Sequence, residues 1–328
     1  MISLVYLFLF FELTKNNQDI WHEIRSDASN INLTYLWIAL LLMPANWLIE
    51  SVKWKFLINK IERVSTWSAF QAVLAGTAIS IFTPNRIGDY LGRIFILKEG
   101  DRLDGTVATI VGNLSQLLIT LIMGSIAIFY FMGDITYQLM GLDASASIYF
   151  RILILIIDFS LLYSFFQFPK IEKKLNKNFE IYRYPIIRHL NLVAEFKPDE
   201  LLKVLLYSLL RFIIYSFQFY LLFLAFQLHL DFIEGMLVIF LIFFGITLIP
   251  SIAVAELGIR GLITIFIFNT LWSNNYVLSE IETTLVSSTS LLWLINLALP
   301  AIIGGLFIFK LRFLRKSDDL FPDKNSKS

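Results

Sequence analysis

Two apolar stretches of this chain are each broken by residues that the interior of a membrane does not normally tolerate. In residues 78–93, Pro84 is followed by a carboxylate, two glycines and arginines. In residues 249–261, Pro250 is likewise followed by a carboxylate, glycines and an arginine. Paired segments interrupted by proline and glycine in the two halves of a membrane protein indicate where a transported group binds. We therefore expect these two segments to organise the rest of the fold.

The composition is typical of a helical membrane protein. Of the 328 residues, 57% are hydrophobic and 16% are charged, and the mean hydropathy is +0.70. The chain has no cysteine and three scattered histidines, so its sequence indicates neither thiol chemistry nor a metal site. The sequence shows no glycine-rich phosphate loop and no basic nucleic-acid domain. We therefore expect no cofactor and no nucleic-acid partner.

We predict an all-α, polytopic membrane protein with about six full spans, since crossing ~30 Å of hydrocarbon takes about 20 helical residues. The predicted spans are residues 1–13 (short or tilted, unless the start codon is assigned too late), 33–49, 105–131, 149–168, 201–230 and 284–309. After the second of these, Lys53, Trp54 and Lys55 are predicted to anchor the chain at the cytoplasmic interface.

The distribution of lysine and arginine predicts the orientation. Cytoplasmic loops carry an excess of these residues, which places residues 50–67, 169–200 and the C-terminus inside. Residues 132–148 and 273–283 contain neither lysine nor arginine and are predicted to lie outside. For residues 50–67 to lie inside and residues 132–148 outside, residues 68–97 must return to the side from which they entered. We expect a cell inner or plasma membrane protein whose two termini are both cytoplasmic.

Residues 68–97 are therefore predicted to form either two crossings or, as we favour, a re-entrant hairpin. Residues 235–272 also return to their own side, the exterior, so the two hairpins enter from opposite faces. This arrangement would follow from an inverted repeat. We treat residues 1–328 as one transmembrane domain, with residues 169–200 as a basic cytoplasmic segment and residues 317–328 as a disordered tail.

The charged residues of the two broken segments are the leading site candidates. Arg86, Asp89 and Arg93 suit a polar pocket for a lipid phosphate, because arginine pairs with phosphate oxygens through two hydrogen bonds. The alternative is an interfacial loop with arginines that reach to the headgroups and a local salt bridge. Glu256 and Arg260 allow the same two interpretations. We favour the phosphate pocket over the interfacial loop, because ionisable residues at membrane depth commonly mark a functional site.

Asp158 and Arg211 form a second candidate set. Each lies about ten residues from the predicted cytoplasmic end of its span, so both should lie at the same depth, ~15 Å into the membrane. A pair of opposite charges at that depth would offset the cost of burying either one alone. We expect either a structural ion pair or an intramembrane relay that lines a cavity.

The segment 84–93, with the preceding Lys53-Trp54-Lys55 and the later segment 250–261, resembles the transmembrane region of lysylphosphatidylglycerol synthases. The resemblance covers about residues 30–310, and this region also occurs alone as flippase-like membrane proteins. In the full-length synthases a separate soluble domain makes the lipid. The longest soluble segment here, 169–200, is too short for such a domain, so the resemblance implies transport and no enzymatic activity.

We expect the chain to move a phospholipid or polyprenyl-phosphate headgroup through a hydrated cavity between the hairpins. Arg86 and Arg260 would hold phosphate, and Asp89 and Glu256 would orient them or meet a cationic headgroup. One alternative is an accessory protein that docks a membrane-associated transferase, such as a glycosyltransferase or a lipid-modifying enzyme, through its basic segment. Another alternative, a membrane-embedded transferase, would use Asp89 or Glu256 as a base.

The first hairpin is testable with a single cysteine at Asn85, because the natural chain has none. We expect a membrane-impermeant thiol reagent to label this cysteine from the cytoplasmic side, where the hairpin begins. Labelling from the exterior alone, as at a full extracellular loop, would contradict the cytoplasmic entry.

Overall fold

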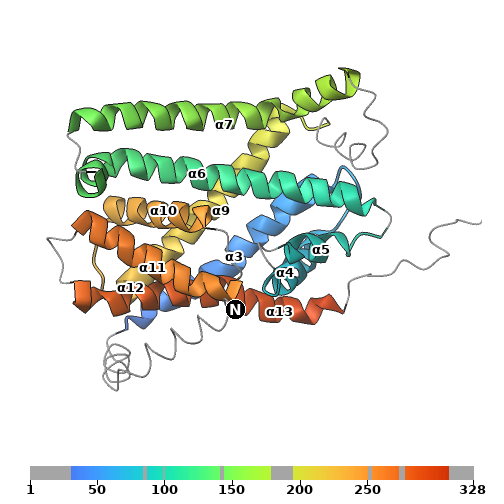
Figure 1. Ribbon diagram of the computed structural model, residues 1–328. Helices are drawn as coiled ribbons and strands as arrows, with labels where there is room; N and C mark the ends of the chain where they lie inside the picture. The colour runs from blue at the N-terminus through green and yellow to red at the C-terminus, as the bar shows by residue number, and fades with distance from the viewer. Residues whose placement is uncertain are drawn as a thin grey trace, which may run out of the picture.

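The computed structural model describes residues 31–83, 87–98, 100–140, 144–178, 195–249, 253–272 and 278–309. Helices are the only regular secondary structure in this part of the chain, as predicted (Figure 1). Its elements are α3 (Leu33–Ile58), α4 (Thr66–Ser80), α5 (Gly88–Ile94), α6 (Arg102–Met140), α7 (Ala144–Asn178), α9 (Pro198–Ala225), α10 (Phe232–Leu248), α11 (Ala253–Trp272), α12 (Leu278–Trp293), η3 (Leu294–Ala298) and α13 (Leu299–Ile308).

Within the described residues, six stretches are helical, long enough and apolar enough to cross a membrane. Five of them coincide with predicted spans, in helices α3, α6, α7, α9 and the continuous α12–η3–α13. The sixth lies in α11, which we had predicted to be an arm of the second hairpin. The predicted span 1–13 and the predicted tail 317–328 lie outside the described residues. The described residues thus hold six candidate spans, five of them predicted, and the predicted span 1–13 stays a prediction.

Helix α3 continues past the predicted span end and overturns the predicted interface anchor. Lys53 and Trp54 are both 1% exposed. The Lys53 ammonium lies 2.8 Å from the Glu50 carboxylate, and the Trp54 indole N–H donates to Thr109 Oγ1 at 3.1 Å. These polar groups have partners inside the protein. Helix α3 can therefore continue through Lys53 and Trp54 instead of ending before them.

Two predicted loops are helical over part of their length. Helix α6 runs through about half of the predicted exterior loop 132–148, to Met140, and α7 begins at Ala144. Helix α7 also extends to Asn178, into the segment 169–200 that we predicted to be soluble. Residues 179–194 of that segment lie outside the described residues.

Helices α4 and α5 pack tightly against each other and are both short. They contain 15 and 7 residues, or about 22 Å and 10 Å of helix, which is less than the ~30 Å of hydrocarbon. A methyl group on Gly92 would overlap the backbone of Gly76, so glycine permits the close approach. Paired short arms are compatible with a hairpin, although its re-entrant path stays a prediction and its tip, residues 84–86, lies outside the described residues.

The second predicted hairpin has longer arms than the first. Helix α10 has 17 residues and α11 has 20, and α11 contains one of the six candidate spans. The two predicted hairpins therefore differ in length, and neither the second hairpin nor the inverted repeat is confirmed.

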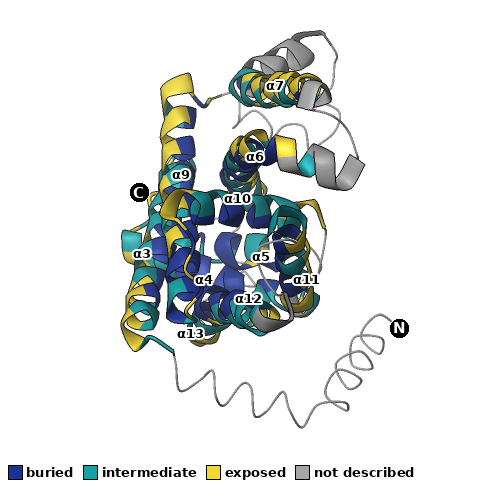
Figure 2. Cartoon of the chain, turned by 90° about the vertical axis from the view of Figure 1, so that its left-hand side faces the viewer, coloured by how far each residue is buried: buried dark blue, intermediate teal, exposed yellow. Residues whose placement is uncertain are grey.

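Aromatic side chains join the central helices. The ring of Phe212 on α9 lies 5.2 Å from that of Phe240 on α10, and Phe223 on α9 lies 5.9 Å from Phe268 on α11. Helix α3 packs along α9 in the same core. Figure 2 shows these buried helices together, with α6 between them and α7.

Helix α7 has few neighbours. Its main packing partner among the described helices is α6, and no residue of its most apolar 18-residue window is buried. In Figure 1 the two helices run side by side along one edge of the molecule. A helix so apolar and so exposed has lipid as its surroundings.

The last span contains a π-helical segment, η3, which ends two residues before Pro300. A proline cannot donate a backbone hydrogen bond, and such single-turn π segments often occur at functional sites. Here the segment carries Asn296, whose side-chain oxygen accepts a hydrogen bond from Asn46 Nδ2 at 3.1 Å. Helix α3 and the last span are thereby joined near the middle of the protein.

The contact between α13 and α4 generates a stability prediction with a neighbouring control. A methyl group on Gly304 would overlap the carbonyl of Leu74, whereas one on Gly305 would meet nothing within 4 Å. We expect Gly304→Ala to destabilise the detergent-solubilised protein by about 1–3 kcal/mol through overpacking. Gly305→Ala should be neutral or stabilising by up to about 1 kcal/mol. Equal thermal unfolding midpoints for the two variants would contradict the close packing.

Candidate functional site

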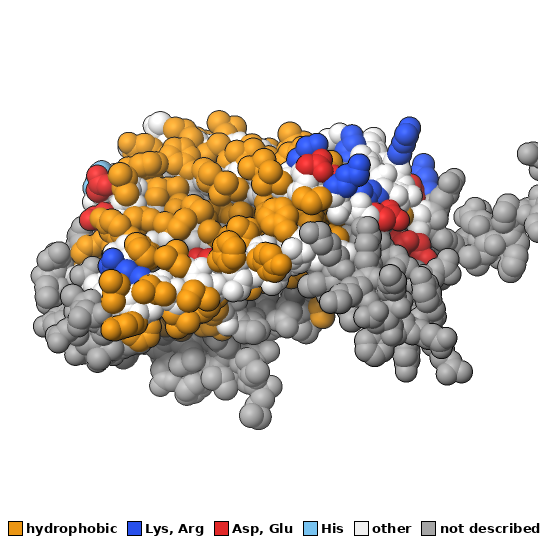
Figure 3. All heavy atoms as spheres, turned by 90° about the horizontal axis from the view of Figure 1, so that it is seen from above, with side chains coloured by type: hydrophobic (Ala, Val, Ile, Leu, Met, Phe, Trp, Pro, Cys, Tyr) orange, Lys and Arg blue, Asp and Glu red, His pale blue; other side chains and the backbone are white. Residues whose placement is uncertain are grey.

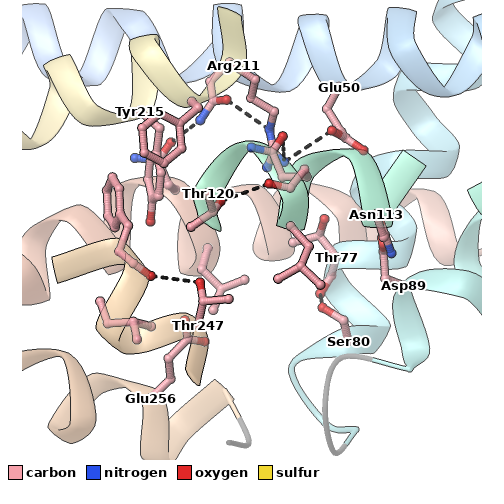
Figure 4. A pocket seen from close by; sticks show the side chains of 18 of the residues that line it. Glu50, Thr77, Ser80, Asp89, Asn113, Thr120, Arg211, Tyr215, Thr247 and Glu256 are labelled. Atoms are coloured by element: carbon pink, nitrogen blue, oxygen red, sulfur yellow. Dashed lines mark hydrogen bonds and ion pairs between the residues drawn. The ribbon is translucent and has the colours of Figure 1, made fainter. Parts of the chain in front are cut away.

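The described charged residues of both broken segments, Asp89, Arg93, Glu256 and Arg260, line one cavity of about 520 Å³. Helices α3, α4, α5, α6, α9, α10, α11 and α12, together with η3, contribute to its wall. Figure 4 shows Glu50 and Arg211 on one side of this space, Glu256 on the other, and Thr77, Ser80 and Asp89 along a third. The charged lining residues are Glu50, Asp89, Arg93, Arg211, Glu256 and Arg260.

Glu50 on α3 connects three cations that come from three helices. One of its carboxylate oxygens lies 2.8 Å from Arg93 Nη1 of α5. The other lies 2.8 Å from Lys53 Nζ of α3 and 3.2 Å from Arg211 Nη1 of α9. The Glu50 side chain is 1% exposed, and a carboxylate so deeply buried requires such partners.

Arg93 joins the first broken segment to this network. Its Nε donates to Asp89 Oδ1 at 2.9 Å, one turn earlier on α5, while its Nη1 bonds Glu50 at 2.8 Å. Both Arg93 and Asp89 line the cavity, as predicted, but the guanidinium is buried between two carboxylates. The third predicted member of this set, Arg86, lies outside the described residues.

Lys53 has three acceptors from three helices. Besides Glu50, its ammonium donates to the carbonyl of Gly112 on α6 at 3.3 Å and to Ser208 Oγ on α9 at 3.4 Å. The Ser208 hydroxyl also contacts Ser115 Oγ at 2.8 Å. An ammonium group has three donors, so Lys53 is fully engaged and acts as a structural link.

Glu256 and Arg260 form an ion pair one turn apart on α11, and both are buried. Arg260 Nε donates to Glu256 Oε1 at 3.1 Å, and Nη1 lies 3.4 Å from the hydroxyl of Tyr215 on α9. The Tyr215 ring stacks on Phe243 of α10 with a centroid distance of 4.8 Å. The second broken segment is thereby tied to α9 and α10.

Arg211 is the most accessible of the three cavity arginines for which an ion pair is described. Its side chain is 23% exposed, against 6% for Arg93 and 8% for Arg260. Its Nε donates to Asn46 Oδ1 at 3.1 Å, and its guanidinium lies 5.3 Å from the ring of Trp47. It shares the Glu50 oxygen that Lys53 already holds, so its charge is only partly balanced.

The six charged lining residues cancel, three arginines against three carboxylates, but Lys53, which is buried and does not line the cavity, adds one positive charge to the described network around Glu50. In the network centred on Glu50, the three cations Lys53, Arg93 and Arg211 face two carboxylates, Glu50 and Asp89. On α11, Arg260 and Glu256 contribute one charge of each sign. An excess of one positive charge inside a low-dielectric wall attracts an anion far more strongly than it would in water.

Asp158 lies apart from this site, so its predicted pairing with Arg211 is wrong. Asp158 on α7 accepts a hydrogen bond from Ser125 Oγ of α6 at 3.0 Å, while Arg211 contacts Glu50. The reason is the packing order: α7 packs mainly on α6, and α6 lies between α7 and the core helices such as α10 (Figure 2). The two residues therefore form no common relay.

The sequence analysis missed Glu50, Lys53 and Asn46 as site residues. We had assigned Lys53 to the interface and had not counted Glu50 or Asn46 among the candidate site residues. Their spacing carried a usable signal, because positions 46, 50 and 53 recur every three or four residues on one face of a helix. A polar face inside an apolar helix indicates a buried polar site.

A family model described as "Lysylphosphatidylglycerol synthase TM region" matches residues 1–281. The chain belongs to this family. The resemblance noted in the sequence is thereby confirmed, and the chain is a multi-pass membrane protein of the flippase-like kind. No curated protein and no solved structure matches it. The match to the lysylphosphatidylglycerol synthase TM region includes all six charged lining residues of the cavity.

The role of Glu50 can be tested by stability. We expect Glu50→Gln to destabilise the protein by about 3–5 kcal/mol, because it leaves buried cations without their shared carboxylate. Glu282→Gln, at an exposed position of α12, should have little effect. The thermal unfolding midpoint in detergent measures both.

A double variant keeps this prediction testable if Glu50→Gln does not fold. Glu50→Gln with Lys53→Met removes one anion and one cation, so it should recover part of the lost stability. A double variant no more stable than Glu50→Gln would contradict the charge balance described for the network.

Proposed function

We propose that this chain binds the phosphate-bearing headgroup of a membrane lipid in the charged cavity and lets that headgroup cross the bilayer. The observation that carries the proposal is a cavity built by membrane helices and lined by three arginines, beside a described ion-pair network that has one positive charge in excess. Charged residues at membrane depth are costly, and those that face a cavity commonly mark a substrate pathway. The substrate class is a phospholipid or a polyprenyl-phosphate-linked group.

Arg211 is the residue that we propose receives the phosphate. It is partly exposed to the cavity, and a guanidinium can give two parallel hydrogen bonds to phosphate oxygens. When Arg211 turns to a phosphate, Glu50 keeps Lys53 and Arg93 at 2.8 Å each. The exchange therefore leaves no buried carboxylate unpaired, which makes reversible binding energetically accessible.

Arg260 supplies a second cation across the cavity. Its partners Glu256 and Tyr215 hold its guanidinium in place, as Asp89 and Glu50 hold that of Arg93. We propose that these carboxylates orient the arginines and that the polar groups between them replace water around the passing headgroup. The acyl chains stay on the lipid side of the helices.

The charge balance bears on which headgroup is favoured. The family description names a lipid that carries lysine, whose headgroup adds positive charge to the phosphate. An occupant with a net negative charge neutralises the excess of one positive charge in the described network beside this cavity, whereas a lysylated headgroup adds to it. We therefore propose an anionic headgroup as the preferred cargo.

The surface supports the proposed orientation. Figure 3 shows charged side chains of both signs gathered at one end of a broad apolar face. Lys60 and Glu200 form an ion pair, with a distance of 2.9 Å, next to the C-terminal end of α3 and the N-terminal end of α9. We propose that this end faces the cytoplasm of the cell inner or plasma membrane, with both termini on that side.

The accessory alternative has less support from the structure. It rests on residues 169–200, of which 179–194 lie outside the described residues, and docking of a membrane-associated transferase stays a prediction. The charged cavity favours lipid binding instead. The proposal assigns binding and movement to this chain and no chemical step.

Lipid movement is tested in proteoliposomes that contain headgroup-labelled phosphatidylglycerol and an external quencher. We expect the wild type to expose label beyond the outer-leaflet fraction. Arg211→Gln should slow this exposure by roughly 10–100-fold, because a hydrogen bond to a charged group contributes ~1.5–3 kcal/mol. The control is Lys203→Gln, which removes a cation from an exposed position of the same helix.

The two variants separate specific from general effects of charge. Equal rates for wild type, Arg211→Gln and Lys203→Gln would contradict a role for the cavity. Faster movement of a lysylated headgroup than of phosphatidylglycerol would overturn the preference for an anion.

A further inference from the structure

A second, apolar cavity of about 220 Å³ lies between α6, α7 and α9. Its wall includes Leu114, Leu117 and Leu121 of α6, Leu161 and Phe165 of α7, and Leu201 of α9. Of all its lining residues, only Ser164 has a polar side chain. We call this cavity the leucine groove.

The leucine groove and the charged cavity share one residue, Leu117. On the same helix, Asn113, Gln116 and Thr120 face the charged cavity. Adjacent helical positions are rotated by about 100°, so one stretch of α6 presents a polar face to one cavity and a leucine face to the other. Leu117 lies at the boundary between the two faces.

We propose that the leucine groove seats an acyl chain of the lipid whose headgroup enters the charged cavity. This inference rests on the proposed function and adds to it a binding site for the apolar end of the same molecule. A phospholipid has a charged group and a hydrocarbon chain joined by a short linker, and the shared Leu117 gives these two parts adjoining places in the protein.

The surroundings of the groove favour hydrocarbon as its occupant. Helix α7 is exposed along its most apolar window and has α6 as its main described partner. Three groove residues, Leu114, Leu117 and Leu161, are 37–42% exposed. In a membrane such a surface meets lipid, and a chain held between packed leucines gains dispersion contacts from several sides.

Pro169 also lines the leucine groove. A proline within a helix lacks the N–H that would bond to the preceding turn, and its ring clashes with that turn. Helix α7 continues past this proline to Asn178, so the groove lies beside the interior of the helix and not beside its end. A hydrocarbon chain is the occupant whose shape adapts to such a space.

The inference is tested with phosphatidylglycerol that carries a photoreactive diazirine on one acyl chain. In proteoliposomes of the wild type, we expect label in residues 111–121 and 161–169. Excess unlabelled phosphatidylglycerol should compete with this label, because the groove is a saturable site. Label on residues 153–157, which face bulk lipid, should not respond to competition.

Two tryptophan substitutions on α7 form a matched pair. Leu161→Trp fills the groove, whereas Leu155→Trp adds the same bulk at an exposed position outside it. We expect Leu161→Trp to remove the competed label and to slow lipid movement by roughly ten-fold. Leu155→Trp should leave both unchanged.

The outcomes distinguish the two proposals. If the wild type moves lipid and Arg211→Gln blocks it, but Leu161→Trp behaves like Leu155→Trp, the groove proposal fails and the proposed function stands. If the wild type moves no lipid, the proposed function fails first. A disulfide between two chains that carry Leu161→Cys would show that a second copy occupies the groove, which also overturns the inference.

Discussion

The carboxylate of Glu50 is the interaction on which the interior of this protein depends. It lies within hydrogen-bonding range of cations from α3, α5 and α9, so it joins the short α4–α5 pair to the long central helices. In hydrocarbon none of these four charges would be tolerated alone. Their mutual neutralisation is therefore a condition for assembling the helices, and the same cluster forms one wall of the cavity.

The proposed function depends on the positive charge that this neutralisation leaves unbalanced. A fully balanced cluster would be a structural element only, whereas here Arg211 shares an anion that two other cations already hold. The Arg211 side chain can thus turn to a ligand while Glu50 keeps its two other cations. The buried network then stays close to neutral and intact. The paired residues on α11 add a second fixed cation opposite, so that the cavity presents arginines from more than one side.

Much of this arrangement follows from local rules, and the rest from contacts between distant residues. Asp89, Arg93, Glu256 and Arg260 were predictable because charge beside proline and glycine in an apolar stretch must face the protein interior. Glu50 was not, because its partner Arg93 is 43 residues away and no local rule pairs them. The supposed pair of Asp158 and Arg211 shows the converse error, since equal depth does not imply adjacency when α6 lies between.

The π segment in the last span lets one helix serve two sets of neighbours. Before it, α12 packs against α11 and α9, and after it, α13 packs against α4. A π turn holds more residues than an α turn, so it offsets the helical register of everything that follows. Removal of a single residue from 294–298 would turn α13 by about 100° about its axis. Gly304 would then no longer face α4, and the close contact between α13 and α4 would be lost. The last span would then no longer connect the cavity wall at η3 with the cavity wall at α4.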